Sequence, residues 1–274
     1  MRLVPLLLAV LALAGCGRGE QVADESRTVI AAFYPLAWAA EQVASGSVDE
    51  VVNLTQPGAE PHDIELSPKD VEAIRDAYLV VYVGGGFQLA VEDALAGRDG
   101  PSLDVLEGDQ DPHVWLDPVR FAQGVERIAE RLGGAGSAHG LIRRLKRLDE
   151  QYRSGLSRCP RRTLVTTHAA FGHLAARYGL TQLSLAGRSP EAEPGPRELE
   201  RLIEKVRASG ATTVFSEPLV SDRLAETVAR EAGAEVAVLD PLEGLSEQRL
   251  AAGEDYLTVM RRNLATLREA LGCT

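Results

Sequence analysis

Short apolar runs alternate along this chain with longer stretches in which apolar residues recur at helical spacing. Runs of four to seven residues rich in Val, Ile, Leu and Thr are typical of buried strands. The first half predicts strands at residues 28–33, 48–54, 79–83 and 102–106. The second half predicts strands at residues 163–167, 182–185, 213–216 and 235–239. The predicted helices are residues 35–43, 71–77, 87–95, 169–178, 197–208, 222–232 and a long terminal helix 246–271.

Residues 119–158 break this rhythm, because strand signals vanish and two amphipathic helical stretches replace them. The stretches are 119–132 and 141–156, and a Gly-rich turn at 133–136 separates them. We therefore expect an α/β protein with two parallel-sheet lobes, residues 27–118 and 159–274, joined by a long connecting helical segment. A ligand site is expected in the cleft between the lobes, at the carboxyl ends of the strands.

The helix at 141–156 is strongly cationic, with Arg143, Arg144, Lys146, Arg147 and Arg153. Such a helix could face a membrane or a nucleic acid. Its apolar stripe of Leu and Tyr side chains favours a solvated helix that packs on the body of the protein.

The amino terminus is typical of an exported protein. Arg2 is followed by an apolar run too short to span a bilayer, which predicts a signal peptide at residues 1–15. Leu13-Ala-Gly-Cys16 resembles the lipobox of bacterial lipoproteins, in which the Cys becomes the lipidated first residue. We expect Cys16 to be lipidated, with 16–26 as a flexible tether and the protein held outside the membrane by lipid alone, at the cell surface or in the periplasm. Ordinary signal cleavage with an incidental Cys16 is the alternative.

Charge and cysteine content narrow the possibilities further. The 274 residues carry 29 Lys and Arg against 40 Asp and Glu, a net charge of -11, which argues against nucleic-acid binding and permits a cation as ligand. Apart from Cys16, the chain has two cysteines, Cys159 and Cys273. An exported chain meets oxidising conditions, so we expect a disulfide between them, with two free thiols as the alternative.

Four side chains occupy equivalent places at predicted strand ends: His62, His113, His168 and Asp240. Three neutral imidazoles and one carboxylate suit a tetrahedral Zn²⁺ site. Their spacings carry no metal signature, and single histidines are often structural. The Gly run at 84–86 lacks the Lys and Ser or Thr of a phosphate-binding loop, so we interpret it as a tight turn.

Several stretches of the chain resemble the zinc and manganese solute-binding proteins of bacterial ABC importers, the cluster A-I receptors. The stretches include Pro57-Gly-Ala-Glu-Pro-His62-Asp, Asp111-Pro-His113-Val-Trp-Leu, Thr167-His168-Ala-Ala-Phe171-Gly, Gly187-Arg-Ser-Pro-Glu, Phe215-Ser-Glu217 and Leu239-Asp240-Pro-Leu. The resemblance covers residues 27–272. It implies two α/β lobes joined by a long rigid helix, and it makes His62, His113, His168 and Asp240 the metal ligands.

The residue at the third ligand position indicates the metal. Manganese receptors of this kind usually carry Glu there, whereas the nitrogen of His168 favours zinc over manganese. Many zinc receptors also have a long His-rich loop before the second ligand. Residues 97–111 contain no His here. They carry acidic residues, among them Asp104, Glu107, Asp109 and Asp111, and we expect a solvated charge run.

Neighbouring polar residues have expected supporting roles. Glu217 is expected to orient a ligand imidazole through its other ring nitrogen. Glu60 and Asp63 flank His62 but are expected to lie outside the ligand set. His173 is expected to be structural, and His139 to lie in solvent.

The resemblance implies an extracytoplasmic receptor that captures Zn²⁺ and delivers it to a membrane ABC permease. We expect a monomer without enzymatic activity. A manganese receptor or an adhesin of the same fold is the first alternative. The second is a zinc hydrolase with the three histidines as ligands and Glu217 as general base, but the chain lacks a His-Glu-x-x-His motif.

Overall fold

The first of two four-stranded parallel sheets is built from the amino-terminal part of the chain. The computed structural model describes residues 26–274 except 45, 47, 107, 135 and 190–193, so the predicted signal peptide, Cys16 and Glu107 lie outside the described residues. The strands are β1 (Thr28–Ala31), β2 (Glu50–Asn53), β3 (Leu79–Tyr82) and β4 (Ser102–Asp104), in the order β2-β1-β3-β4. Val29 and Ile30 of the central strand are almost completely buried, as the apolar run predicts.

The second sheet repeats this topology in the carboxyl-terminal part. Its strands are β5 (Thr163–Thr166), β6 (Thr181–Ser184), β7 (Thr213–Ser216) and β8 (Glu235–Val238), in the order β6-β5-β7-β8. All strand pairs in both sheets are parallel, so within each sheet the carboxyl ends of the strands lie at the same edge. The two-lobe α/β fold expected from the sequence is confirmed.

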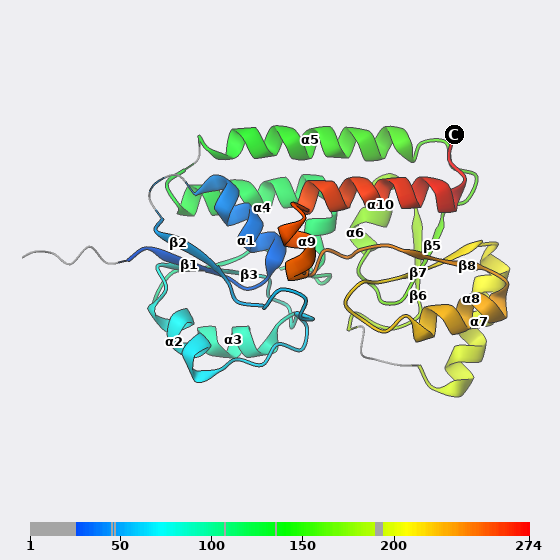
Figure 1. Ribbon diagram of the computed structural model, residues 1–274, viewed down its shortest axis with the longest axis horizontal. Coiled ribbons are helices and arrows are strands. Elements are labelled where there is room, and N and C mark those ends of the chain that lie inside the picture. Colours follow the sequence, from blue (N-terminus) through cyan, green and yellow to red (C-terminus); the bar gives the residue numbers. More distant parts are fainter. Residues whose placement is uncertain (1–25, 45, 47, 107, 135, 190–193) are drawn as a thin grey trace, which may run out of the picture.

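Helices cover both faces of each sheet (Figure 1). In the first lobe α1 (Tyr34–Val43) lies on one side, and α2 (Pro68–Asp76) and α3 (Leu89–Ala96) lie on the other. In the second lobe α7 (Pro196–Ser209) packs against α8 (Arg223–Ala232), and α6 (Gly172–Tyr178) follows β5. Ser67 caps α2 through a capping box with Asp70, so the helix begins before the predicted residue 71.

A helical hairpin connects the lobes. Its helices are α4 (Pro118–Arg131) and α5 (Ala138–Gly155), and a turn with Gly133 at a φ of 69° separates them. The Asp117 side chain accepts hydrogen bonds from the first backbone N–H groups of α4. Figure 1 shows α5 running along the outer face of the molecule across both lobes, so α5 is the long connecting helix.

The predicted terminal helix 246–271 is wrong in one respect, because it is two helices. They are α9 (Glu247–Ala251) and α10 (Tyr256–Leu271). Gly253 adopts a left-handed φ of 78°, which ends α9, and the Asp255 side chain caps α10 by accepting from Thr258 N–H. The break brings α10 beside α5, where the buried Tyr152 hydroxyl donates to the Met260 carbonyl at 2.7 Å.

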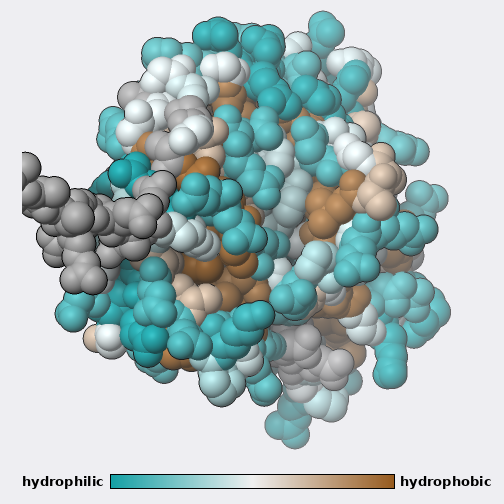
Figure 2. Space-filling model, turned by 60° about the vertical axis from the view of Figure 1, so that its left-hand side comes forward, coloured by the Kyte–Doolittle hydropathy of each residue, from teal (hydrophilic) through white to brown (hydrophobic). Residues whose placement is uncertain are grey.

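The expected disulfide is confirmed, since Cys159 and Cys273 are bonded across a separation of 114 residues. It joins the segment after α5 to the end of α10. Figure 2 shows a face covered mostly by hydrophilic side chains, with hydrophobic ones visible between them in separate groups. Among the helices of the described residues, none has both the length and the apolar character needed to cross a membrane.

Candidate metal centre

Three histidines from different loops lie at the facing edges of the two lobes. His62 lies in the loop between β2 and α2, and His113 directly precedes a short 3-10 helix, Val114–Leu116. His168 follows the end of β5 by two residues. These are the strand-end positions that the sequence predicts, and the structure brings all three together.

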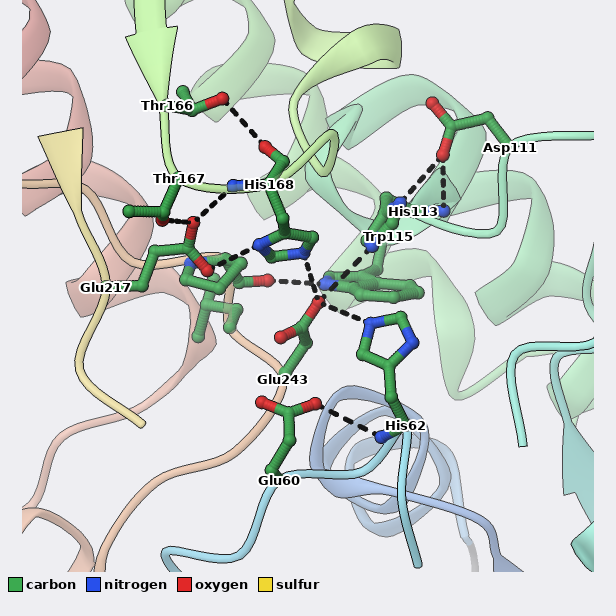
Figure 3. A network of polar contacts seen from close by, with 12 residues as sticks. Glu60, His62, Asp111, His113, Trp115, Thr166, Thr167, His168, Glu217 and Glu243 are labelled. Atoms are coloured by element: carbon green, nitrogen blue, oxygen red, sulfur yellow. Dashed lines mark hydrogen bonds and ion pairs between the residues drawn. The ribbon is translucent and has the colours of Figure 1, made fainter. Parts of the chain in front are cut away.

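The fourth member of this group is Glu243, from the segment between β8 and α9. Its Oε1 lies 3.3 Å from His62 Nε2, 3.3 Å from His113 Nε2 and 3.2 Å from His168 Nε2. One ligand atom from each of the four side chains lies within 4.8 Å of every other. Figure 3 shows the three rings around the Glu243 carboxylate. This is a donor set of three nitrogens and one oxygen, which suits zinc.

The cluster is almost fully shielded from solvent. The exposed fraction of the side chain is 8% for His62, 0% for His113 and His168, and 1% for Glu243. Burial alone would raise the pKa of the Glu243 carboxyl, but its contacts with the three imidazoles hold this pKa well below its usual range. The buried cluster therefore contains a carboxylate that is ionised at neutral pH.

Carboxylates behind two of the imidazoles fix their orientation. His168 Nδ1 lies 2.6 Å from Glu217 Oε2, and His113 Nδ1 lies 2.7 Å from Asp111 Oδ1. A carboxylate at Nδ1 keeps a proton on that nitrogen, so Nε2 is the atom that can bind a metal once its own proton is lost. Burial would lower the pKa of His168, but its contacts with Glu217 and Glu243 raise it to about 10.

Glu217 is itself held in place. It accepts hydrogen bonds from the Thr167 hydroxyl and, at 3.2 Å, from the His168 backbone N–H. The contact expected between Glu217 and a ligand imidazole is therefore present. Asp111 was expected only in the acidic loop, and its spacing of two residues from His113 is the signal that could have revealed its role.

His62 has different surroundings. Its backbone N–H donates to Glu60 Oε1 at 3.1 Å, and its ring meets the Phe87 ring edge-on at 4.4 Å between centroids. Burial and the nearby Glu243 raise the pKa of Glu60 to about 8. Asp63 is exposed to solvent. Neither Glu60 nor Asp63 belongs to the group of converging ligand atoms.

The structure does not bring Asp240 into this group. Asp240 Oδ1 accepts from Leu242 N–H at 2.7 Å, and Oδ2 forms an ion pair with Arg249 at 2.7 Å. Both carboxylate oxygens are therefore engaged elsewhere, whereas Glu243, three residues later, points at the histidines. An acidic residue inside the apolar run at 241–245 was the available signal for Glu243.

The backbone around Leu242 directs Glu243 into the cluster. Leu242 has a φ of 57°, the left-handed region that costs a residue with a Cβ about 1–2 kcal/mol. The Trp115 indole donates to the Pro241 carbonyl at 2.7 Å, and Asn263 exchanges two hydrogen bonds with the Asp240 backbone. These contacts hold the turn in place.

The remaining predicted neighbours have structural contacts. His173 Nε2 lies 2.9 Å from the Asp111 carbonyl oxygen, and His139 is exposed on α5, as expected. In the described part of the acidic loop, Asp104 accepts from two backbone N–H groups, and Asp109 pairs with Arg120. These carboxylates support the fold of the loop, so the expectation of a purely solvated charge run is wrong for them.

A family model described as zinc-uptake complex component A, periplasmic, matches residues 29–270. The chain belongs to this family. Zinc-binding protein AdcA of Streptococcus pyogenes serotype M1 is 36% identical over 92% of the chain, which spans only 57% of that relative's length. High-affinity zinc uptake system protein ZnuA of Bacillus subtilis is 30% identical over 95% of the chain and 94% of its own length. The resemblance inferred from the sequence is confirmed.

Solved structures of the family share the fold. The Zn(II)-bound ZnuA-like domain of Streptococcus pneumoniae AdcA is 34% identical, with a TM-score of 0.76 over 90% of this chain and 99% of that one. The laminin-binding protein Lmb of Streptococcus agalactiae, described as having adhesin and metal-transporting activity, has a TM-score of 0.81 and is 31% identical, over 90% of this chain and all of that one.

Proposed function

We propose that this protein is an extracytoplasmic receptor that binds one Zn²⁺ through His62, His113, His168 and Glu243 and delivers it to a membrane ABC permease. The convergence of three imidazole Nε2 atoms on one buried carboxylate is the observation that carries this proposal. Membership of a zinc-uptake family supports it. Glu243 replaces Asp240, the fourth ligand expected from the sequence.

Two ligands come from each lobe, which gives the receptor a way to take up and release its cargo. His62 and His113 belong to the proposed lobe 27–118, and His168 and Glu243 belong to the lobe 159–274. Separating the lobes would split the ligand set in half. The connecting segment 119–158 would set how far they move.

The buried set of four side chains favours a carrier over an enzyme. A zinc hydrolase needs an open coordination position for water and a carboxylate free to act as general base. Glu217, the candidate base, instead contacts His168 Nδ1 and the Thr167 hydroxyl. We therefore propose a transport receptor without catalytic activity.

Zinc titration of histidine variants tests the proposal. His62→Ala, His113→Ala and His168→Ala should each weaken zinc binding by more than about 100-fold, because each removes a direct ligand. His139→Ala removes an exposed imidazole from α5 and is the matched control, with unchanged affinity. Wild-type affinity in all three ligand variants would reject the site.

A competition titration with Mn²⁺ tests the choice of metal. The nitrogen of His168 should give a clear preference for Zn²⁺, and His168→Glu should shift that preference towards Mn²⁺ by supplying a hard oxygen. Equal affinity of the wild type for both metals would contradict the zinc assignment.

We also propose that lipid on Cys16 holds the receptor at the membrane and that the receptor is a monomer. Cys16→Ala should move the protein from the membrane fraction to the soluble fraction, and sedimentation should give the mass of one chain. A variant that remains in the membrane fraction would contradict the anchor.

A further inference from the structure

A groove rich in arginine lies between α5 and α10, remote from the metal cluster. The two helices run side by side along the outer face, and the chain ends beside them (Figure 1). The groove has a volume of about 780 Å³, within the range of small-ligand sites. Arg147 and Arg158 line it from the α5 side, and Arg261 and Arg268 line it from the α10 side.

The four guanidinium groups are available to a ligand. Among the described residues, none of them makes an ion pair or a side-chain hydrogen bond, and all four residues are exposed. Other arginines near these helices are engaged, since Arg153 pairs with Asp149 and Arg262 pairs with Glu254. Arg143 of α5 is also exposed and lies outside the groove, so what distinguishes the groove is that four such guanidinium groups from two helices line one space.

The groove has an excess of positive charge. Among the described residues that line it, Glu150 is the one with an acidic side chain, so four positive side chains face one negative one. The whole chain has a net charge of -11, which makes a local positive excess unusual for this molecule. The groove would repel Zn²⁺ and attract anions.

Helix dipoles do not account for all four arginines. Basic side chains stabilise the negative carboxyl end of a helix, but the effect falls off within the last turn. Arg268 is in the last turn of α10, and Arg158 lies just beyond α5. Arg147 and Arg261 lie two or more turns before the ends of their helices, so this effect leaves them unexplained.

The backbone on the two sides of the groove is held together by close contacts. A Cβ added at Gly155 would lie 3.2 Å from both Leu264 and Arg268, so this glycine allows close approach of the two helices. At the far end, the Thr274 backbone N–H donates to the Arg158 carbonyl, next to the disulfide. A preformed groove loses less entropy on binding than a mobile one.

We propose that this groove binds a phosphate-bearing oxyanion with at least two negative charges. Guanidinium groups form planar, two-pronged hydrogen bonds with phosphate oxygens, and four of them on two sides of a groove can bridge successive phosphates. The neutral side chains of Gln151 and Ser154 on the same face supply further hydrogen bonds. The phosphate can belong to a soluble phosphate chain or to a phospholipid headgroup.

Calorimetric titration with inorganic tripolyphosphate tests the proposal. The mature chain is used without lipid and free of metal, because tripolyphosphate chelates zinc. Saturable binding is expected, and the double variant Arg147→Gln/Arg261→Gln should weaken it at least about tenfold, because hydrogen bonds to charged groups are strong. Gln has a helix propensity close to that of Arg, so both helices are retained.

The matched control is Arg143→Gln/Arg201→Gln, which removes two exposed charges outside the groove, on α5 and α7. It should change tripolyphosphate binding less than about twofold. Zinc affinity and thermal stability should be unchanged in both double variants.

Vesicles distinguish the two sources of phosphate. Binding to phosphatidylglycerol vesicles but not to phosphatidylcholine vesicles, with loss in the groove variant only, would support the site and assign it to a lipid headgroup. Saturable tripolyphosphate binding without vesicle binding would assign it to a soluble anion. Failure of both ligands to bind at millimolar concentration, or equal loss in both double variants, would overturn the proposal.

Discussion

Replacing Glu243 by Gln tests which carboxylate completes the metal centre. Gln keeps the size of the side chain but removes the negative charge that lies 3.2 to 3.3 Å from three Nε2 atoms. Losing a residue that only orients a ligand costs about 10- to 100-fold in metal affinity. Losing a charged ligand should therefore cost more than about 100-fold, or more than about 2.8 kcal/mol of binding free energy.

Asp240→Asn is the informative comparison. The Asn side-chain oxygen can still accept from Leu242 N–H, so the turn that presents Glu243 is kept. The variant loses the ion pair with Arg249, which should lower the free energy of unfolding by about 1–3 kcal/mol. Its zinc affinity should stay within about tenfold of wild type, because tenfold is the smallest loss expected when a residue that orients a metal ligand is replaced.

A competition titration against a chromophoric zinc chelator measures both variants, with urea denaturation alongside to report stability. Glu204→Gln, on the exposed face of α7, controls for the loss of one negative charge. A loss above about 100-fold in Asp240→Asn, together with wild-type affinity in Glu243→Gln, would refute the assignment of Glu243.

Three further predictions concern protons, orientation and stability. Contacts with Glu217 and Glu243 outweigh burial and raise the pKa of His168 to about 10, so below that pH zinc must displace a proton. The affinity for zinc should therefore fall about tenfold for each pH unit as the pH is lowered from 8 to 6. A zinc affinity that does not change with pH would contradict this. Glu217→Gln should weaken zinc binding about 10- to 100-fold in the same chelator assay, whereas unchanged affinity would reject its orienting role. Replacing Cys159 and Cys273 together by Ser should lower the free energy of unfolding in urea by about 2–5 kcal/mol under non-reducing conditions, and unchanged stability would show that the disulfide contributes nothing.

The fold could be predicted from the sequence because the spacing of hydrophobic residues reflects which side chains are buried in each strand or helix. The apolar runs at 79–83 and 213–216 lie in β3 and β7 within one residue of the structure. The break in the terminal helix was harder to predict, because Gly253 and Asp255 are compatible with exposed positions in one continuous helix and also with a turn between two helices. Only the packing of α10 against α5 decides between these two readings.

The convergence of the three histidines could be predicted, because parallel strands place their carboxyl ends at one edge of a sheet. Asp240 and Glu243 could not be separated in this way, because both follow β8 within five residues. The left-handed turn at Leu242 sends one carboxylate to Arg249 and the other to the histidines. That turn depends on Trp115 and Asn263, which are distant in the sequence.

The proposed ligand set would couple zinc binding to the relative position of the lobes. Glu243 comes from the second lobe, yet two of its three imidazole contacts are with His62 and His113 of the first. The third imidazole, of His168, is held by Glu217 from the same lobe as itself. Opening the lobes would therefore leave His168 and Glu243 together and remove the other two ligands. Two ligands bind zinc more weakly than four, so with the proposed ligand set lobe separation would favour release of the ion.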